Sequence, residues 1–199
     1  MERRLILIAA LAAAGRFDEM AEAVRAAHDD GVSTAAIREA IVFLVPYAGW
    51  PTALNALLAA HAVVPLSATT TDPLDTADRA ARRELGLTTA RTVNDRFDRV
   101  AENVAAIDPA LVDLLAEGAY GYVYNRAGLD LVQRELLAVA ILAVQGHDRQ
   151  LLYHLRGAAN VGASQDDITG TIEALADVSD DVRERGRRAW NDLYRRLNP

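Results

Sequence analysis

The chain has 199 residues, a formal net charge of −7 and no cysteine. The acidic balance argues against a nucleic-acid partner, which requires a basic face. The lack of cysteine excludes disulfides, thiol catalysis and metal sites built on cysteine. Alanine and leucine are abundant and β-branched runs are few, which favours an all-α fold.

The first expected helix spans residues 3–14, where two arginines precede an apolar run. A short secretory signal has the same pattern, including the Ala-x-Ala end at 12–14. An internal repeat favours a structural helix, because a shift of 131 positions aligns the two ends of the chain without a gap. The aligned identities include Arg3/Arg134, Leu5/Leu136, Ala9/Ala140, Leu11/Leu142, Gly15/Gly146, Arg25/Arg156, Gly31/Gly162, Ser33/Ser164, Ile37/Ile168 and Leu44/Leu175. No apolar run reaches the ~18 residues of a membrane span, and we expect a cytoplasmic protein.

Each copy of the repeat predicts three helices, at 3–14, 18–30 and 34–45 and again at 130–145, 149–161 and 165–177. Trp50-Pro51 restarts a helix over 52–63, with the proline near its first position. A threonine-rich linker occupies 65–73. We therefore expect a first repeat at 1–64, the linker at 65–73, and a second, fuller repeat at 74–199. Further helices are expected at 75–85, 89–106, 109–122 and 180–197.

Glu135 and His154 form the most plausible acid/base couple in the chain. If the helices at 130–145 and 149–161 fold back on each other about Gly146, the heights of the two side chains differ by about 5 Å. A carboxylate that accepts the imidazole N–H fixes the tautomer of the histidine and prepares it for proton transfer. A satisfied structural pair is the alternative. The first copy has Arg4 and Ala23 at these positions, so the fold itself does not require the pair.

Several neighbouring side chains are candidates for binding a substrate. Arg126, Arg134 and Arg156 are suited to a carboxylate, although Arg25 occupies the Arg156 position in the other copy, which favours a structural ion pair there. Tyr120, Tyr122 and Tyr124 are candidates for lining a pocket, although such a stripe more often belongs to an interface or to the core. His147 lies in the hairpin turn, but no local ligand spacing supports a metal site. Residues 25–44 and 156–175 resemble a helix-turn-helix. Their expected recognition helices begin Thr34-Ala35-Ala36, which offers almost no donors to phosphate or bases, and Gln165-Asp166-Asp167, which would repel phosphate, so DNA binding is not expected.

Four segments resemble the carboxymuconolactone decarboxylase family: YGYVYNRAGLD at 120–130, RELLAVAILAVQG at 134–146, HLRGAANVGAS at 154–164 and PYAGWPTALNAL at 46–57. Residues 82–175 resemble the N-terminal and central part of the family, and residues 1–60 resemble its central and C-terminal part. The resemblance implies an all-α, alkylhydroperoxidase-D-like helical fold with an internal duplication, assembled into a homo-oligomer. The peroxidase branch has a Cys-x-x-Cys where this chain has His147 and Gln150, so peroxidase activity is not expected.

The cysteine-free branch implies a lyase without metal or organic cofactor, which decarboxylates a small lactone carboxylic acid. Glu135 and His154 would be catalytic, and Arg126 or Arg134 would stabilise charge. Tyr120, Tyr124, His147, Tyr47 and Trp50 complete the expected substrate-binding set. The Tyr-x-Gly-x-Pro of the family follows only the first copy, at 47–51, whereas the second copy has Val178-Ser179-Asp180 there. We therefore expect a composite pocket, formed between copies or between subunits. The alternative is a non-catalytic helical or ligand-binding protein of the same fold.

Overall fold

The computed structural model describes residues 2–66 and 78–197, and its secondary structure within those ranges is entirely helical. The all-α prediction is confirmed. The elements are α1 (Glu2–Ala13), α2 (Phe17–Asp29), α3 (Thr34–Val42), α4 (Val45–Val63), α5 (Arg79–Val93), α6 (Phe97–Ala105), α7 (Pro109–Leu114), a π-helix η2 (Leu115–Val123), α8 (Leu131–Gln145), α9 (Asp148–Asn160), α10 (Gln165–Ala174), a 3₁₀ turn η3 (Leu175–Asp177) and α11 (Asp180–Leu197).

The local structure of the two copies follows the sequence repeat. Gly15 and Gly146 both have a φ of 72°, and each lets the chain turn after the first helix of its copy. Ser33 and Ser164 cap the third helices, each accepting a backbone N–H with its side chain. The duplication is therefore a structural repeat as well as a sequence repeat.

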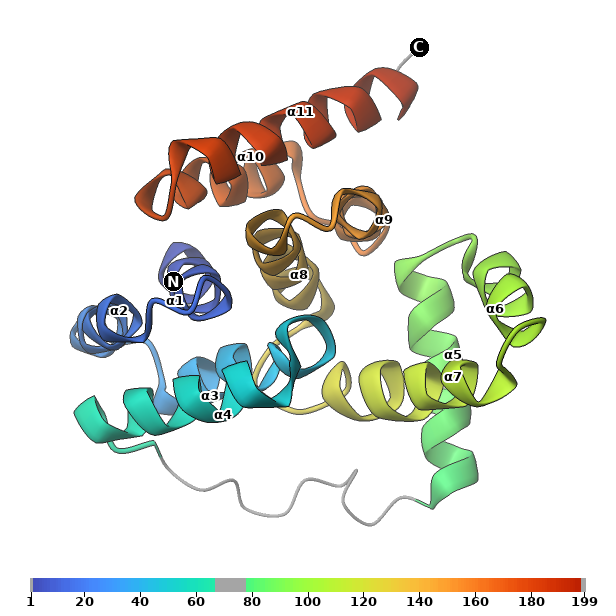
Figure 1. Ribbon diagram of the computed structural model, residues 1–199, viewed down its shortest axis with the longest axis horizontal. Coiled ribbons are helices and arrows are strands. Elements are labelled where there is room, and N and C mark those ends of the chain that lie inside the picture. The colour runs from blue at the N-terminus through green and yellow to red at the C-terminus, as the bar shows by residue number, and fades with distance from the viewer. Residues whose placement is uncertain (1, 67–77, 198–199) are drawn as a thin grey trace.

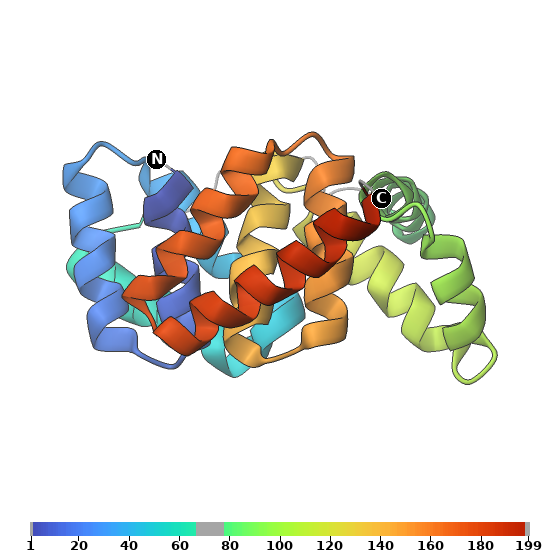
Figure 2. The same cartoon turned by 90° about the horizontal axis from the view of Figure 1, so that it is seen from above.

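Helix α8 lies at the centre of the molecule, between the α1–α2 and α9 sides, with α10 and α11 across one end and α3–α4 across the other (Figure 1). The view from above shows the two copies side by side, with α5, α6 and α7 at one edge (Figure 2). Residues 134–143 of α8 are all buried. Helix α1 packs against α8 as part of the same core, as its aligned position in the repeat requires.

Helix α5 crosses η2 at backbone contact distance. A Cβ added at Gly86 would lie 1.8 Å from the carbonyl oxygen of Ala116, and one added at Gly121 would lie 2.4 Å from that of Arg82. No side chain fits between the two backbones at either position. This contact holds η2 in place, and η2 with the residue that follows it carries Tyr120 and Tyr124.

The expected helix at 89–106 is wrong. Helix α5 continues to Val93 and α6 begins at Phe97, because Asn94 is extended and its side chain accepts the backbone N–H of Arg96 at 2.9 Å. Such a side-chain turn competes with the helix. Of the expected helix at 75–85, the described part begins at Arg79. Most of the expected 65–73 linker lies outside the described residues, so the predicted domain boundaries stay a prediction.

Within the described residues, no single helix combines the length and apolar composition of a membrane span, although α3 and α4, bent by 118°, meet that test together.

Candidate active site

Glu135 of α8 and His154 of α9 meet across the helical hairpin. His154 Nδ1 lies 3.0 Å from Glu135 Oε2. Glu135 is fully buried and His154 is 8% exposed. A buried carboxylate is tolerated only with hydrogen-bonding partners, and the histidine supplies one of them.

Tyrosine hydroxyls complete the surroundings of the carboxylate. Tyr124 donates its hydroxyl proton to Glu135 Oε1 at 2.6 Å, and the hydroxyl of Tyr47 lies 2.5 Å from that of Tyr124. The ring of Tyr47 stands edge-on to His154, with centroids 5.2 Å apart. Burial raises the pKa of Tyr47 and Tyr124 well above that of an exposed tyrosine, and the charge of Glu135 raises it further. Both hydroxyls therefore keep their protons at neutral pH.

Tyr47 comes from the first repeat, whereas the other residues of this site come from the second. Helix α4 breaks at Gly49, which has a φ of 81°. Before the break Tyr47 points into the site, whereas after it Trp50 is 68% exposed. The structure thus brings together the Glu135–His154 pair and one half of the 47–51 segment. Trp50 does not join them.

Arg126 and Arg134 face a different carboxylate. Arg126 makes two hydrogen bonds to Glu39 of α3, at 2.9 and 3.0 Å. Arg134 is fully buried, donates to the backbone oxygen of Arg126 at 2.5 Å, and lies 4.0 Å from Glu39. Burial lowers the pKa of Arg134. The ring of Phe43 lies between this cluster and the Glu135 site, since it contacts the Arg134 guanidinium on one side and the ring of Tyr124 on the other.

The other predicted residues have separate places. Tyr120 is buried and its ring lies 4.8 Å from that of Tyr124. Arg156 pairs with Asp95 at 2.9 Å, as the structural ion-pair interpretation requires. His147 is exposed at the start of α9, seven residues or about 10 Å along the helix from His154. Among the described residues, no group of three or more histidine, aspartate or glutamate side chains is placed to hold a metal ion.

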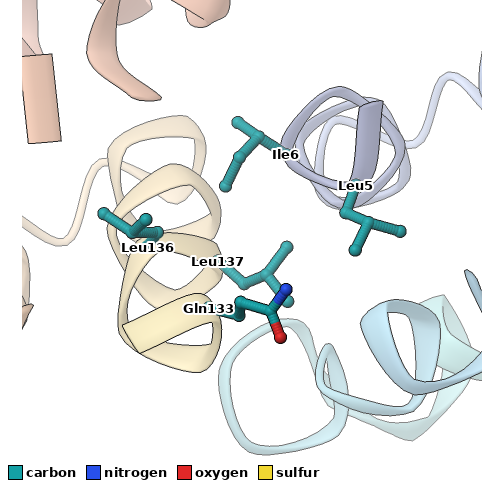
Figure 3. Close-up of a pocket in the computed structure, with 5 residues that line it drawn as sticks. All are labelled: Leu5, Ile6, Gln133, Leu136 and Leu137. Carbon is teal, nitrogen blue, oxygen red and sulfur yellow. The ribbon is translucent and has the colours of Figure 1, made fainter. Parts of the chain in front are cut away.

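The expected composite pocket coincides with neither of two hollows found among the described residues. One is a narrow apolar crevice between α1 and α8, lined by Leu5, Ile6, Gln133, Leu136 and Leu137 (Figure 3). The other, of about 260 Å³, lies between α10 and α11. The Glu135 site instead approaches the surface at His154, whose side chain is 10% exposed, and at the half-buried Tyr47. Because Nδ1 faces the buried Glu135, Nε2 is the ring nitrogen that does not face the carboxylate.

Sequence reasoning missed Glu39, Phe43 and Gly157. A Cβ added at Gly157 would lie 2.2 Å from Glu135 Oε2, so the absence of a side chain there makes room for the carboxylate. The repeat held a signal for this, because the first copy has Ala26 at the Gly157 position and Arg4 at the Glu135 position. The glycine and the glutamate therefore change together.

Gly157→Ala is expected to push the Glu135 carboxylate away from His154 and to destabilise the fold by about 1–3 kcal/mol, because the methyl group overpacks the site. Urea unfolding measures the change. Gly170→Ala is the matched control, since no neighbouring atom lies within 4 Å of an added Cβ there, and alanine in a helix stabilises by about 0.5–1 kcal/mol. Equal stability of the two variants would contradict the steric argument.

The carboxymuconolactone decarboxylase family matches the chain over residues 1–62 and 109–191. The 4-carboxymuconolactone decarboxylase of Acinetobacter baylyi (strain ATCC 33305 / BD413 / ADP1) is 30% identical over 75 residues, which are 38% of this chain and 56% of that protein. The chain thus spans just over half the length of this relative. The two matched segments correspond to the two repeated parts of the fold.

Proposed function

The chain belongs to the carboxymuconolactone decarboxylase family, and we propose that it is a cofactor-free, decarboxylase-like lyase acting on a small carboxylated lactone such as 4-carboxymuconolactone. The observation that carries this proposal is the buried hydrogen bond between Glu135 and His154 in the second repeat. Peroxidase chemistry based on a thiol is excluded because the chain has no cysteine. The cytoplasmic location expected from the sequence stays part of the proposal.

The reaction needs one proton and one place to put an electron pair. The bond between the ring carbon and the carboxylate breaks, carbon dioxide leaves, and the electron pair delocalises into the conjugated lactone carbonyl as a dienolate. His154, as the imidazolium, then delivers the Nε2 proton to carbon and is reloaded from solvent. Throughout the reaction Glu135 accepts the hydrogen bond from the Nδ1–H group of His154, and its negative charge stabilises the charged ring.

Arg126 and Arg134 take a supporting role in this proposal. Both are held by Glu39 or by backbone on the far side of Phe43, so neither is free to clamp a substrate carboxylate. They join α3 of the first repeat to the segment between η2 and α8. The aromatic side chains around the acid/base pair are Tyr47, whose ring packs against that of His154, and Tyr124 and Tyr120 beside Glu135.

The alternative function is a ligand-binding or purely structural helical protein, and the small exposure of the Glu135 site favours it. Calorimetric titration with 4-carboxymuconolactone, followed by an ultraviolet assay of the same sample, separates the two functions. A lyase both binds and consumes the lactone. Binding without consumption would support the ligand-binding alternative, and neither binding nor consumption would reject both roles for this lactone.

We also propose that the chain forms a homo-oligomer through one face of α4. Trp50, Leu54 and Leu58 recur every four residues on this helix and are 68%, 54% and 71% exposed. The whole helix carries no aspartate, glutamate, lysine or arginine.

Leu54→Lys/Leu58→Lys is expected to convert the oligomer into a monomer of 21.5 kDa. The two lysines place charges on the face of α4 that the second copy would cover, and burying them disfavours self-association. Light scattering after size-exclusion chromatography measures the mass. Leu111→Lys/Leu114→Lys on α7, which replaces two leucines of similar exposure, is the control and should leave the mass unchanged. A wild-type protein that is itself monomeric would overturn the proposed assembly.

A further inference from the structure

We propose that Tyr124 and Tyr47 are positioning residues, and that a hydrogen-bonded chain from Tyr47 through Tyr124 to Glu135 keeps the Nδ1 proton on His154. Nε2 is then the one nitrogen of the ring through which His154 exchanges protons. The effect of this hydrogen-bonded chain on a reaction rate rests on the proposed function. Its effect on the tautomer of His154 is independent of that function.

The direction of each hydrogen bond follows from the number of protons available. Tyr124 has one hydroxyl proton and gives it to Glu135 Oε1. The contact of 2.5 Å between the hydroxyls of Tyr124 and Tyr47 must therefore be donated by Tyr47. A carboxylate is an acceptor at both oxygens, so the ring nitrogen that faces Oε2 is the donor. All the protons in the chain point toward Glu135.

The rings of Tyr47 and Tyr124 pack against neighbouring aromatic rings, which fixes their hydroxyl groups in place. The hydrogen-bonded chain can therefore orient the Glu135 carboxylate. The ring of Phe43 lies 4.9 Å from that of Tyr124 and 5.4 Å from that of Tyr47. Tyr120 flanks Tyr124 at 4.8 Å. Tyr124 is 3% exposed and directly follows η2, which is fixed against α5. Rotation of the Glu135 carboxylate would break its hydrogen bonds to both partners.

The two repeats contribute different residues to the hydrogen-bonded chain, so neither repeat contains a complete site. The second repeat has Glu135 and His154 but carries Val178 at the position of Tyr47. The first repeat has Tyr47 but carries Arg4 and Ala23 in place of the acid/base pair. Arg4 instead pairs at the surface with Asp30. Tyr47 is thus the residue through which the first repeat contributes to the hydrogen bonds around Glu135 and His154 of the second repeat.

The proposal makes a specific claim about combined substitutions. If Tyr47 acts only through Tyr124, removing both hydroxyls costs no more than removing that of Tyr124 alone. Tyr124→Phe is expected to lower kcat about tenfold, because a hydrogen bond to a charged group is lost. Tyr47→Phe is expected to lower it about threefold. Independent substrate contacts would instead make the two losses multiply.

Nitrogen-15 NMR of the imidazole rings is the test, because it reports the tautomer without any substrate. The chain has four histidines, and the spectrum of His154→Gln identifies the signals of His154. In the neutral ring of the wild-type protein, Nδ1 should give a protonated signal and Nε2 an unprotonated one. Tyr124→Phe should shift both toward the average of the two tautomers, and Tyr47→Phe should do so to a smaller extent.

Tyr153→Phe is the control for these spectra. Tyr153 lies on the same helix as His154, one residue away, and its ring contacts Arg149. This substitution should leave the His154 signals unchanged. Wild-type His154 signals in a folded Tyr124→Phe variant would overturn the proposal, and Tyr47→Phe provides the same test if Tyr124→Phe does not fold. A shifted tautomer in a protein that never decarboxylates the lactone would uphold the hydrogen-bonded chain and reject the proposed function instead.

Discussion

Replacing Glu39 by alanine is expected to destabilise the protein by about 3–5 kcal/mol, the range for removing one partner of a buried ion pair. Glu39 is 1% exposed and lies among the guanidinium groups of Arg38, Arg126 and Arg134. Nε and Nη1 of Arg134 are buried without a hydrogen-bond partner even in the native protein. Without Glu39, these three largely buried cations would lose the carboxylate that they share.

Urea unfolding followed by circular dichroism measures the loss for Glu39→Ala. Glu22→Ala is the control, because Glu22 is exposed on α2 and such surface changes stay within about 0.5 kcal/mol. Glu39→Gln, which keeps the shape of the side chain, should retain part of the hydrogen bonding and fall between the two. A loss below about 1 kcal/mol for Glu39→Ala would show that the cluster does not hold α3 to the second repeat.

Replacing His154 by glutamine is expected to lower the rate of lactone decarboxylation by about 10²–10⁴-fold, the usual contribution of a general acid. The loss should fall on kcat rather than on KM, because the proton is delivered in the transition state. Glu135→Gln should cost about 10²-fold, since the glutamine amide can donate to Nδ1 and then favours the wrong tautomer of His154. Steady-state kinetics followed by ultraviolet absorbance measures both.

His147→Gln is the control for these kinetics. His147 is exposed at the start of the same helix, so its replacement should leave kcat and KM at their wild-type values. A His154→Gln variant with the same kcat as the wild-type protein would remove His154 from the chemistry. Equal losses from His147→Gln and His154→Gln would point to a general effect on α9 rather than to proton transfer.

The helical hairpin was predictable because it depends on local signals. The glycine at 146, the serine cap at 164 and the gapless repeat each specify short segments whose geometry is well known. The position of Glu135 opposite His154 then follows from the rise of a helix. The all-α fold follows in the same way from composition and periodicity.

The Glu39 cluster was not predictable, because it depends on how distant elements pack. Glu39 and Arg126 are 87 residues apart in sequence, and the pattern of α3 alone gives no reason to expect a buried carboxylate. Because the sequence does not reveal the contacts with Glu39, it predicts Arg126 and Arg134 as substrate-binding residues. The separation of Tyr47 from Trp50 likewise depends on the φ of Gly49, which the sequence does not state.

The expected cavity also depended on tertiary packing. Tyr47 packs edge-on against His154, and this ring comes from the first repeat. The ring of Tyr47 therefore fills part of the space beside His154 in which a pocket is expected.

The most direct measurement is the release of carbon dioxide from 4-carboxymuconolactone by the wild-type protein and by His154→Gln, at equal concentration of folded protein. If Glu135 and His154 form the acid/base couple of a lyase, the wild-type protein releases one carbon dioxide per lactone consumed and the variant is slower by at least a hundredfold. No release by the wild-type protein, or equal release by both, would contradict that assignment.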